Sequence, residues 1–417
     1  MSVLQADSIA SNPQRAGARE ILLLVTLAAM QFTNILDFMI IMPLGPQLMR
    51  VLDIGPQKFS LLVSAYTFAA AASGFVAAFW IDRVGRKRAL LTMYAGFIIA
   101  TALCGFATSH VWLLAARIVA GVFGGVIGAL VFTIIADVVP YARRARATAM
   151  VAAAFSFAAV VGVPAGLWIA TQFSWRAPFL ALAGFSVAVG LAAWRVLPAL
   201  DANVQTAQLR NPIAQLRAIF GVRNHQRAFA FILALMISVF MVVPFIAPYT
   251  VANVGLSESE LPLIYFAGGL TTLFTAQAIG WLADAYGKKR IFTILGLLSL
   301  VPFIVLTHLP PVPLLYVIVV TTAFFAFVPG RFGPAMALIT GSVEPRLRGS
   351  FMSFNGSLQQ LGAGIASLAA GLIVGRAADG SLTHYDWAGW CAVGATLIAI
   401  MLARRIVIVP DGSRAID

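Results

Sequence analysis

Residues 78–88 read AFWIDRVGRKR and residues 280–290 read GWLADAYGKKR, so one short charged phrase occurs twice, about 200 residues apart. In both copies an acid, a glycine three residues later and a basic cluster keep the same register, and each copy lies between two long apolar runs. A chain that repeats itself at half its length is typical of duplication, and many membrane transporters are built in this way. The repeat therefore predicts two similar halves.

The composition indicates that this chain is embedded in a lipid bilayer. Hydrophobic residues make up 61% of the chain and charged residues 10%, whereas a soluble domain carries about 25% charged residues. The two cysteines lie apart in apolar runs and the four histidines do not cluster, so we expect no disulfide and no metal site. The net charge of +13 lies mostly in short gaps between apolar runs, which favours membrane topology over a nucleic-acid partner.

Apolar windows of about 20 residues, the length that crosses a bilayer, occur twelve times. We expect an all-α integral membrane protein of twelve transmembrane helices, in two pseudo-symmetric six-helix bundles around a central cavity. The predicted spans are 20–43, 59–80, 89–108, 111–136, 147–170, 177–197, 228–252, 260–282, 291–309, 312–338, 351–375 and 386–403. The predicted domains are an N-terminal tail (1–19), a first bundle (20–197), a linker (198–227), a second bundle (228–403) and a C-terminal tail (404–417).

The distribution of Lys and Arg predicts the orientation. If the N-terminus lies inside, the outer gaps hold only Arg50, Lys58, Arg176 and Arg376, and nearly all other basic residues lie inside. This asymmetry predicts cytoplasmic termini and a cytoplasmic linker in the plasma (inner) membrane. Residues 1–19 are polar and do not resemble a cleaved signal. Within the linker, residues 209–220 mix Arg with apolar residues, so this stretch is either a helix on the membrane surface or a simple tether.

The repeated phrase resembles the loop signature between helices 2 and 3 of the major facilitator superfamily, Gly-x-Leu-Ala-Asp-Arg-x-Gly-Arg-Arg/Lys. The first copy has Ala78 and Ile81 where glycine and alanine are usual. The resemblance implies that the charged loops act as gates, with Asp82 capping helix 11 in the outward-open state and Asp284 acting likewise on helix 5. The implied gating residues are Asp82, Arg83, Gly85, Arg86, Gly280, Asp284, Gly287 and Lys288. The alternative is that the basic residues only enforce topology, and both roles are compatible.

Two further stretches resemble signatures of subgroups within this superfamily. Residues 117–125, RIVAGVFGG, resemble the arginine-glycine signature of proton-coupled members. Residues 162–166, GVPAG, resemble the helix 5 antiporter signature of exporters, although Val163 separates the glycine from the proline. Gly162, Pro164 and Gly166 are the positions that match. The chain is thus similar to twelve-helix drug–proton antiporters and related sugar or metabolite exporters, which implies no cofactor and usually a monomer.

Away from the predicted span ends, three charged residues lie inside spans: Asp37, Arg117 and Arg331. Charge in hydrocarbon is costly and marks a functional site by default. Asp37 and Arg117 both lie roughly 9 Å below the predicted outer boundary at 1.5 Å rise per residue. We expect Asp37 to take up and release the coupled proton beside Arg117, and the alternative is a static ion pair between helices 1 and 4. Arg331 either binds an anionic group or extends its long side chain to the interface.

Polar side chains at helical spacing predict the walls of the cavity. Gln31, Asn34 and Asp37 form one stripe on the first helix, and Asn355 and Gln359 form an i, i+4 pair in the eleventh. Each of these residues alone is also a common contact between helices.

The sequence therefore predicts a secondary active transporter that exports small amphipathic or hydrophobic compounds in exchange for protons. The alternative is proton-coupled transport of a sugar or another small metabolite. An enzyme or a nucleotide-driven pump is disfavoured, because the chain has no catalytic cluster and no phosphate-binding glycine loop.

Overall fold

A computed structural model of the chain describes residues 13–80, 84–198 and 217–409. Most of the predicted tails and linker lie outside the described residues, as do Asp82 and Arg83. The part of the linker that the structure describes is helical over residues 217–220. There Ile219 is buried among the apolar residues of the second half.

Ten helical segments make up the described first half. They are α1 (Pro13–Ile40), α2 (Gly45–Val51), α3 (Pro56–Trp80), α4 (Arg86–Gly105), α5 (His110–Val138), α6 (Tyr141–Ala152), α7 (Ala154–Phe157), η3 (Ala158–Gly162), α8 (Val163–Gln172) and α9 (Ala177–Val196).

The second half repeats this pattern with more interruptions. Its helical segments are α11 (Arg223–Phe240), η5 (Val243–Phe245), α12 (Ile246–Ala252), η6 (Glu258–Glu260), α13 (Leu261–Tyr286), α14 (Lys288–Leu298), α15 (Leu300–Thr307), α16 (Leu314–Phe327), η7 (Pro329–Arg331), α17 (Phe332–Gly341), η8 (Pro345–Leu347), α18 (Arg348–Ile373) and α19 (Tyr385–Arg405). Two short strands, β1 (Gly375–Arg376) and β2 (Leu382–Thr383), pair antiparallel before α19.

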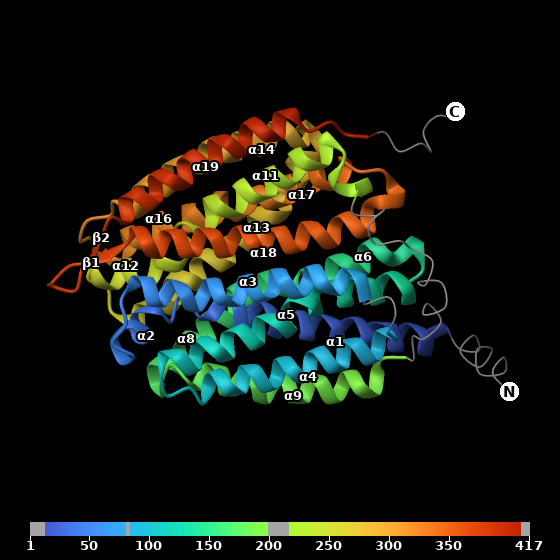
Figure 1. Cartoon of the computed structure of the whole chain (residues 1–417), viewed down its shortest axis with the longest axis horizontal. Helices are drawn as coiled ribbons and strands as arrows, with labels where there is room; N and C mark the ends of the chain where they lie inside the picture. Colours follow the sequence, from blue (N-terminus) through green and yellow to red (C-terminus); the bar gives the residue numbers. More distant parts are fainter. Residues whose placement is uncertain (1–12, 81–83, 199–216, 410–417) are drawn as a thin grey trace.

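Within the described residues, eleven helical stretches are long and apolar enough to cross a membrane. The more polar α18, with 26 residues, lies alongside α3 among them and supplies a twelfth (Figure 1). The predicted all-α membrane architecture is therefore confirmed. Several boundaries differ from the prediction: α1 ends at Ile40 instead of residue 43, α11 begins at Arg223 instead of residue 228, and the helix α2 was not predicted.

Four predicted spans are interrupted in the structure, and a proline lies at or near each interruption. The fifth passes through the π-helical turn η3 directly before Pro164, the seventh bends at Pro244, the ninth divides at Ser299 before Pro302, and the tenth breaks at Pro329. Proline lacks the N–H that would bond the carbonyl four residues earlier, and its ring crowds that carbonyl. Continuous apolar sequence therefore folds here into two or more helical pieces.

The two ends of the molecule differ in how the halves meet. We call the end that holds α2, α12 and the β1–β2 strands the hairpin end, and the end where α1 begins and α19 ends the termini end (Figure 1). One large apolar core near the hairpin end draws residues from both halves, and in it the rings of Phe59 and Phe245 lie 5.8 Å apart. Toward the termini end each half has its own core, within residues 23–197 and 219–406. The halves are thus sealed together at the hairpin end.

Small residues allow α3 and α18 to approach closely across the two halves. A Cβ at Gly364 would stand 2.7 Å from Thr67 Oγ1, and one at Gly74 would stand 2.9 Å from Ser357 Oγ. Small residues let helix backbones approach closely inside a membrane, where packing replaces the hydrophobic effect as the source of attraction. This contact is the longest seam between the two halves (Figure 1).

Candidate functional site

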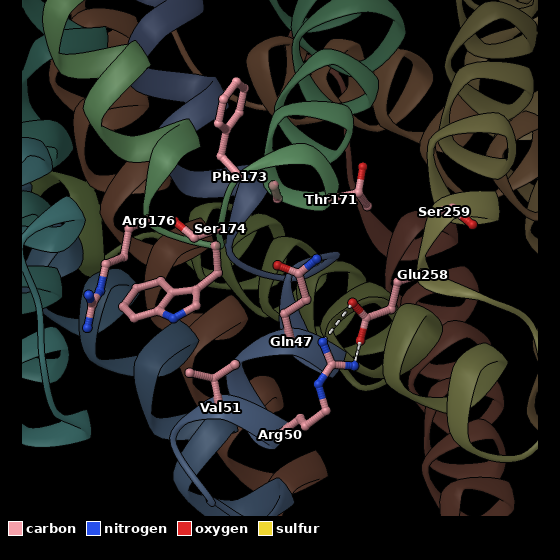
Figure 2. Close-up of a pocket in the computed structure, with 11 residues that line it drawn as sticks. Gln47, Arg50, Val51, Thr171, Phe173, Ser174, Arg176, Glu258 and Ser259 are labelled. Atoms are coloured by element: carbon pink, nitrogen blue, oxygen red, sulfur yellow. Dashed lines mark hydrogen bonds and ion pairs between the residues drawn. The ribbon is translucent and has the colours of Figure 1, made fainter.

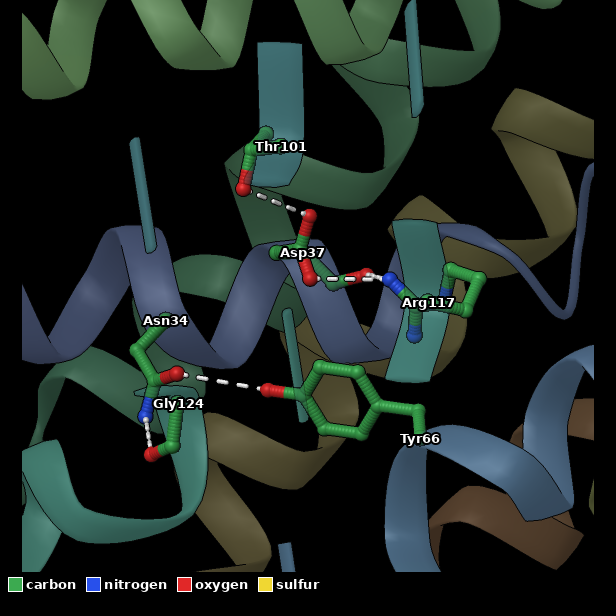
Figure 3. Close-up of polar contacts among 6 residues, drawn as sticks. All are labelled: Asn34, Asp37, Tyr66, Thr101, Arg117 and Gly124. Atoms are coloured by element: carbon green, nitrogen blue, oxygen red, sulfur yellow. Dashed lines mark hydrogen bonds and ion pairs between the residues drawn. The ribbon is translucent and has the colours of Figure 1, made fainter. Parts of the chain in front are cut away.

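The buried acid of the first half lies against a buried base. Arg117 Nη1 on α5 donates to Asp37 Oδ2 on α1 at 2.8 Å, and neither side chain has any exposed surface (Figure 3). Asp37 lies three residues before the end of α1, and Arg117 lies seven residues into α5, so the short connections at the hairpin end bring both to one level. The matching depth expected from the sequence corresponds to a direct contact in the structure.

Two further contacts hold the carboxylate and the backbone of Asp37. Thr101 Oγ1 on α4 donates to Asp37 Oδ1 at 3.1 Å, and Arg117 Nη1 also donates to the backbone carbonyl of Asp37 at 3.2 Å. Nε and Nη2 of Arg117 are buried and have no hydrogen-bond partner among the described residues. Arg117 therefore keeps a tether to α1 that does not depend on the charge of Asp37, and it retains donors that are not in use.

Tyr66 of α3 extends this network toward the middle of the bundle. The guanidinium of Arg117 lies 4.3 Å from the centroid of the Tyr66 ring, within the range of a cation–π interaction. The Tyr66 hydroxyl donates to Asn34 Oδ1 at 3.3 Å, and Asn34 Nδ2 donates to the carbonyl of Gly124 at 3.2 Å (Figure 3). A Cβ at Gly124 would stand 2.5 Å from the Tyr66 hydroxyl, so only glycine leaves room for the network.

The glycines of the helix 5 signature lie against α1 on both sides of Asp37 along the chain. A Cβ at Gly162 would stand 2.9 Å from Leu36 Cδ1, and one at Gly166 would stand 2.7 Å from Ile40 Cδ1. Pro164 lies between them in the first turn of α8, where its missing N–H costs no helical hydrogen bond of its own helix. The two glycines therefore position the turn of α1 that carries Asp37.

Phe38, next to Asp37, connects the site to the second half. Its ring stacks on Tyr66, with centroids 5.5 Å apart, and lies 5.8 Å from the ring of Phe240 on α11. Residues 38–43, FMIIMP, and 240–244, FMVVP, are similar, so Phe38 and Phe240 hold corresponding places in the two halves. A movement of either half therefore changes the packing directly beside the Asp37–Arg117 ion pair.

Arg331 is fully buried in the second half and does not extend to the interface in this structure. It donates from Nη1 to Thr396 Oγ1 at 3.0 Å, from Nη2 to Ser238 Oγ at 3.2 Å and from Nε to the carbonyl of Val328 at 3.2 Å. No acidic side chain within the described ranges forms an ion pair with it. The second half thus holds a buried cation surrounded by hydroxyls, whereas the first half holds an ion pair.

The remaining polar residues of the predicted cavity have different surroundings. Gln31 lies beside Gly128, and its Oε1 is buried without a partner in the described part of the chain. The amide nitrogens of Asn355 and Gln359 both approach the sulfur of Met336 on α17, at 4.0 Å, and Asn355 Oδ1 has no described partner. The hydrogen-bond contacts of these two amide nitrogens are therefore within the second half.

The charged loops are described only in part. Gly85 precedes α4, and Arg86 forms an ion pair with Asp137 at the end of α5. Gly287, at φ 94°, turns the chain between α13 and α14 in a conformation that favours glycine, while Gly280 has open space around it. Asp284 is 77% exposed and forms an ion pair with Lys288 of the next helix, with Nζ–Oδ1 at 3.8 Å.

Sequence reasoning missed four residues that contact or extend the site. Thr101, Tyr66 and Asp137 lie in helices that hold other polar side chains, so nothing in the sequence singles them out. The fourth, Gly124, belongs to the 117–125 stretch, but its contact with Tyr66 depends on helix packing. Within the described residues no group of three His, Cys, Asp or Glu side chains could hold a metal ion.

The profile of the Major Facilitator Superfamily matches residues 27–246 and again residues 228–415. The chain belongs to the major facilitator superfamily. It is therefore a multi-pass membrane protein and a secondary transporter, not an enzyme, and members of this superfamily need no cofactor. The superfamily expected from the repeated charged phrase is confirmed.

Relatives within the superfamily match much of the chain. The Bacillus subtilis (strain 168) proteins named "Uncharacterized MFS-type transporter YceJ" and "Uncharacterized MFS-type transporter YbcL" are each 23% identical to it, over 81% and 76% of this chain and 85% and 79% of their own. Multidrug resistance protein 3 of the same organism is 33% identical over 30% of this chain and 25% of its own. The solved structure of a D-xylose–proton symporter shares the fold, with a TM-score of 0.73 and 16% identity over 94% of this chain and 98% of the other.

Proposed function

We propose that this transporter exports small amphipathic or hydrophobic compounds in exchange for protons, with Asp37 as the proton carrier and Arg117 as its partner. The observation that carries the proposal is the fully buried Asp37–Arg117 ion pair. Replacing such a pair by packed apolar residues is often neutral or stabilising, so stability alone is a weak reason for a chain to hold one. An ionisable residue inside a membrane helix is by default part of a substrate or proton path.

The contacts around Asp37 suggest how a proton could change the conformation. Protonation removes the charge of Asp37 and weakens the bond from Arg117 to Oδ2, while the bond to the Asp37 carbonyl remains. Arg117 then has a cationic group free to bind elsewhere, next to Tyr66 and Asn34. Because Phe38 contacts Phe240 in the other half, a small shift of α1 is transmitted to the interface between the halves.

Export is the direction that we propose from the helix 5 positions Gly162, Pro164 and Gly166. Their resemblance to the antiporter signature is supported by their packing around Asp37 and by the partial similarity to Multidrug resistance protein 3 of Bacillus subtilis. We further propose that both termini are cytoplasmic, so the hairpin end faces outward, and that the two charged loops gate the inner face. The gating set includes Asp82 and Arg83, which lie outside the described residues.

A sugar or another small metabolite is the alternative substrate, and one observation favours it. The amide oxygens of Gln31 and Asn355 are buried without partners among the described residues, and a substrate with several hydroxyls could satisfy them. In both cases we propose Gln31, Asn34, Asn355, Gln359 and Arg331 as the polar residues that substrate meets when the halves separate.

Transport by purified protein in liposomes tests both parts of the proposal. A lipophilic cationic dye, a neutral amphipathic dye and a radiolabelled hexose are each offered with and without a proton gradient, and proton release on substrate addition is measured in detergent. We expect gradient-driven dye transport in the wild type. Asp37→Asn should bind and exchange the dye but release no protons and accumulate nothing.

The exposed Asp53, in the turn before α3, provides the matched control, because Asp53→Asn makes the same chemical change outside the bundle. Asp53→Asn should transport like the wild type. Uphill transport and proton release by Asp37→Asn would place the coupling site elsewhere. Gradient-driven transport of the hexose alone would replace the export proposal by the metabolite alternative.

A further inference from the structure

One charged pair joins the two halves at the hairpin end, away from the buried Asp37 site. Arg50 on α2 donates from both terminal nitrogens to the carboxylate of Glu258 on η6, with Nη2–Oε2 at 3.2 Å (Figure 2). The two residues are 208 positions apart in the chain. A guanidinium that meets a carboxylate through two hydrogen bonds is among the stronger and more directional ion pairs.

The pair lies in the wall of a cavity that both halves line. The cavity has a volume of about 680 Å³ and is formed by α2, the end of α8, the turn before α9, and η6. The side chain of Glu258 is only 15% exposed, whereas that of Arg50 is 65% exposed. Glu258 therefore depends on Arg50 for a counter-charge, while water and salt can still reach the pair.

The other charged groups near η6 have different roles. Glu260 accepts hydrogen bonds from the backbone and hydroxyl of Ser257 and so caps its own helix. Arg176 lies on the opposite side of the cavity, with its guanidinium 5.3 Å from the ring centroid of Trp175 (Figure 2). Of the two acids in η6, only Glu258 reaches the first half through a contact recorded in the described residues.

The contacts around the pair belong to the closed hairpin end. A Cβ at Gly45, at the start of α2, would stand 2.7 Å from Pro248 of α12, and Phe59 contacts Phe245. Alternating access requires the halves to separate at one end while they close at the other. Because Arg50 and Glu258 lie on different halves, separation at the hairpin end must break their bonds.

We propose that Arg50 and Glu258 are positioning residues of the transport cycle, forming an ionic latch that holds the hairpin end closed. The apolar contacts beside them close the same end without regard to charge, whereas the latch adds a bond with a defined geometry that salt can weaken. The strength of the latch then sets the ratio of hairpin-closed to hairpin-open molecules. This proposal rests on alternating access and is independent of the proton carrier, the direction and the substrate.

The test measures the separation of the halves directly. Spin labels are placed at Val111→Cys on α5 and Trp387→Cys on α19, which are 74% and 61% exposed near the hairpin end, in a Cys391→Ser background in lipid nanodiscs. Double electron–electron resonance then gives the populations of short and long distances. Arg50→Glu and Glu258→Arg should each raise the ratio of long to short distances by about fivefold, the effect of losing a pair of this kind. The swap Arg50→Glu/Glu258→Arg should restore the wild-type ratio.

Two controls make the outcome decisive. Lys58→Glu reverses a charge on the same end of the first half, where the lysine side chain is exposed and forms no recorded ion pair, so it should leave the ratio unchanged. High salt should raise the ratio in the wild type but not in Arg50→Ala/Glu258→Ala. Unchanged distances in both single variants, an equal effect of Lys58→Glu, or a swap that fails to restore the ratio would each overturn the latch.

Discussion

Leu36 packs directly on Gly162, so closely that a Cβ on the glycine would stand 2.9 Å from the leucine Cδ1. Leu36 immediately precedes Asp37, and Ile40 makes the corresponding contact with Gly166 one turn later. The signature in helix 5 and the buried acid in helix 1 are thus parts of one packed unit. The two glycines thus have a local packing role, since they set how near α8 lies to the turn of α1 that carries Asp37.

We expect Gly162→Ala and Gly166→Ala to push α1 away from α8 and lower transport. The added methyl groups should cost about 1–2 kcal/mol of stability through overpacking, less whatever the flexible Leu36 and Ile40 side chains can relieve. Gly184→Ala in α9 is the control, because a Cβ there meets nothing within 4 Å. It should be stabilising, since alanine is the better helix former. Thermal unfolding in detergent and transport in liposomes are the measurements, and equal behaviour of all three variants would contradict the packing argument.

A double substitution separates a structural from a coupling role of the ion pair. Arg117→Ala alone leaves Asp37 as a buried charge without its partner and should destabilise the protein by about 3–5 kcal/mol. Asp37→Leu/Arg117→Met removes both charges and should recover most of that loss. The double variant should nevertheless fail to accumulate substrate against a gradient. If the double variant pumps as well as the wild type, the ion pair only holds α1 and α5 together.

The hydroxyls around Arg331 should contribute measurably to the stability of the second half. Thr396→Val and Ser238→Ala each remove an acceptor from a buried guanidinium, which should cost about 1.5–3 kcal/mol. Thr321→Val is the matched control, because that buried hydroxyl donates only to carbonyls of its own helix. A melting temperature equally affected by Thr321→Val and Thr396→Val would show that Arg331 does not depend on these hydroxyls.

Thiol labelling in cells tests the proposed orientation. In a Cys391→Ser background, Gln208→Cys in the linker should resist a membrane-impermeant maleimide until the membrane is opened. Ala378→Cys, between β1 and β2 at the hairpin end, should react in intact cells, since Ala378 is exposed. Reversed reactivities would place the termini outside and would overturn the proposed topology.

Hydropathy was enough to predict the general architecture. The twelve apolar windows correspond to the twelve helical stretches, and equal distances from the span ends were enough to place Asp37 beside Arg117. Both inferences use regularities that act along a single helix, namely its length in a bilayer and its rise per residue. Breaks at Pro164, Pro244, Pro302 and Pro329 were harder to place, because proline in a membrane helix can also be accommodated with only a kink.

Contacts between helices could not be predicted from the sequence. Tyr66 and Thr101 matter because α3 and α4 place them beside Arg117 and Asp37. Residue spacing within one helix does not reveal such contacts. Arg331 was expected to reach either an anion or the interface, whereas the structure surrounds it with hydroxyls from α11 and α19. Arg50 was counted only as a charge of an outer gap and Glu258 was not singled out, because their pairing depends on how the halves are docked.

The polar character of α18 has a consequence for how the protein is made. Its sequence includes Asn355, Gln359 and Gln360, and among the long helices of the described part of the chain it alone falls outside the eleven stretches that are apolar enough to cross a membrane on composition alone. Its closest neighbour is α3, which is synthesised far earlier. We therefore expect α18 to partition poorly into lipid when it leaves the insertion machinery. It should become stable in the membrane only by docking onto the finished first half. Biogenesis of the second half would then depend on the first, and a folding defect in α3 would appear in cells as a failure to insert a helix near the other end of the chain.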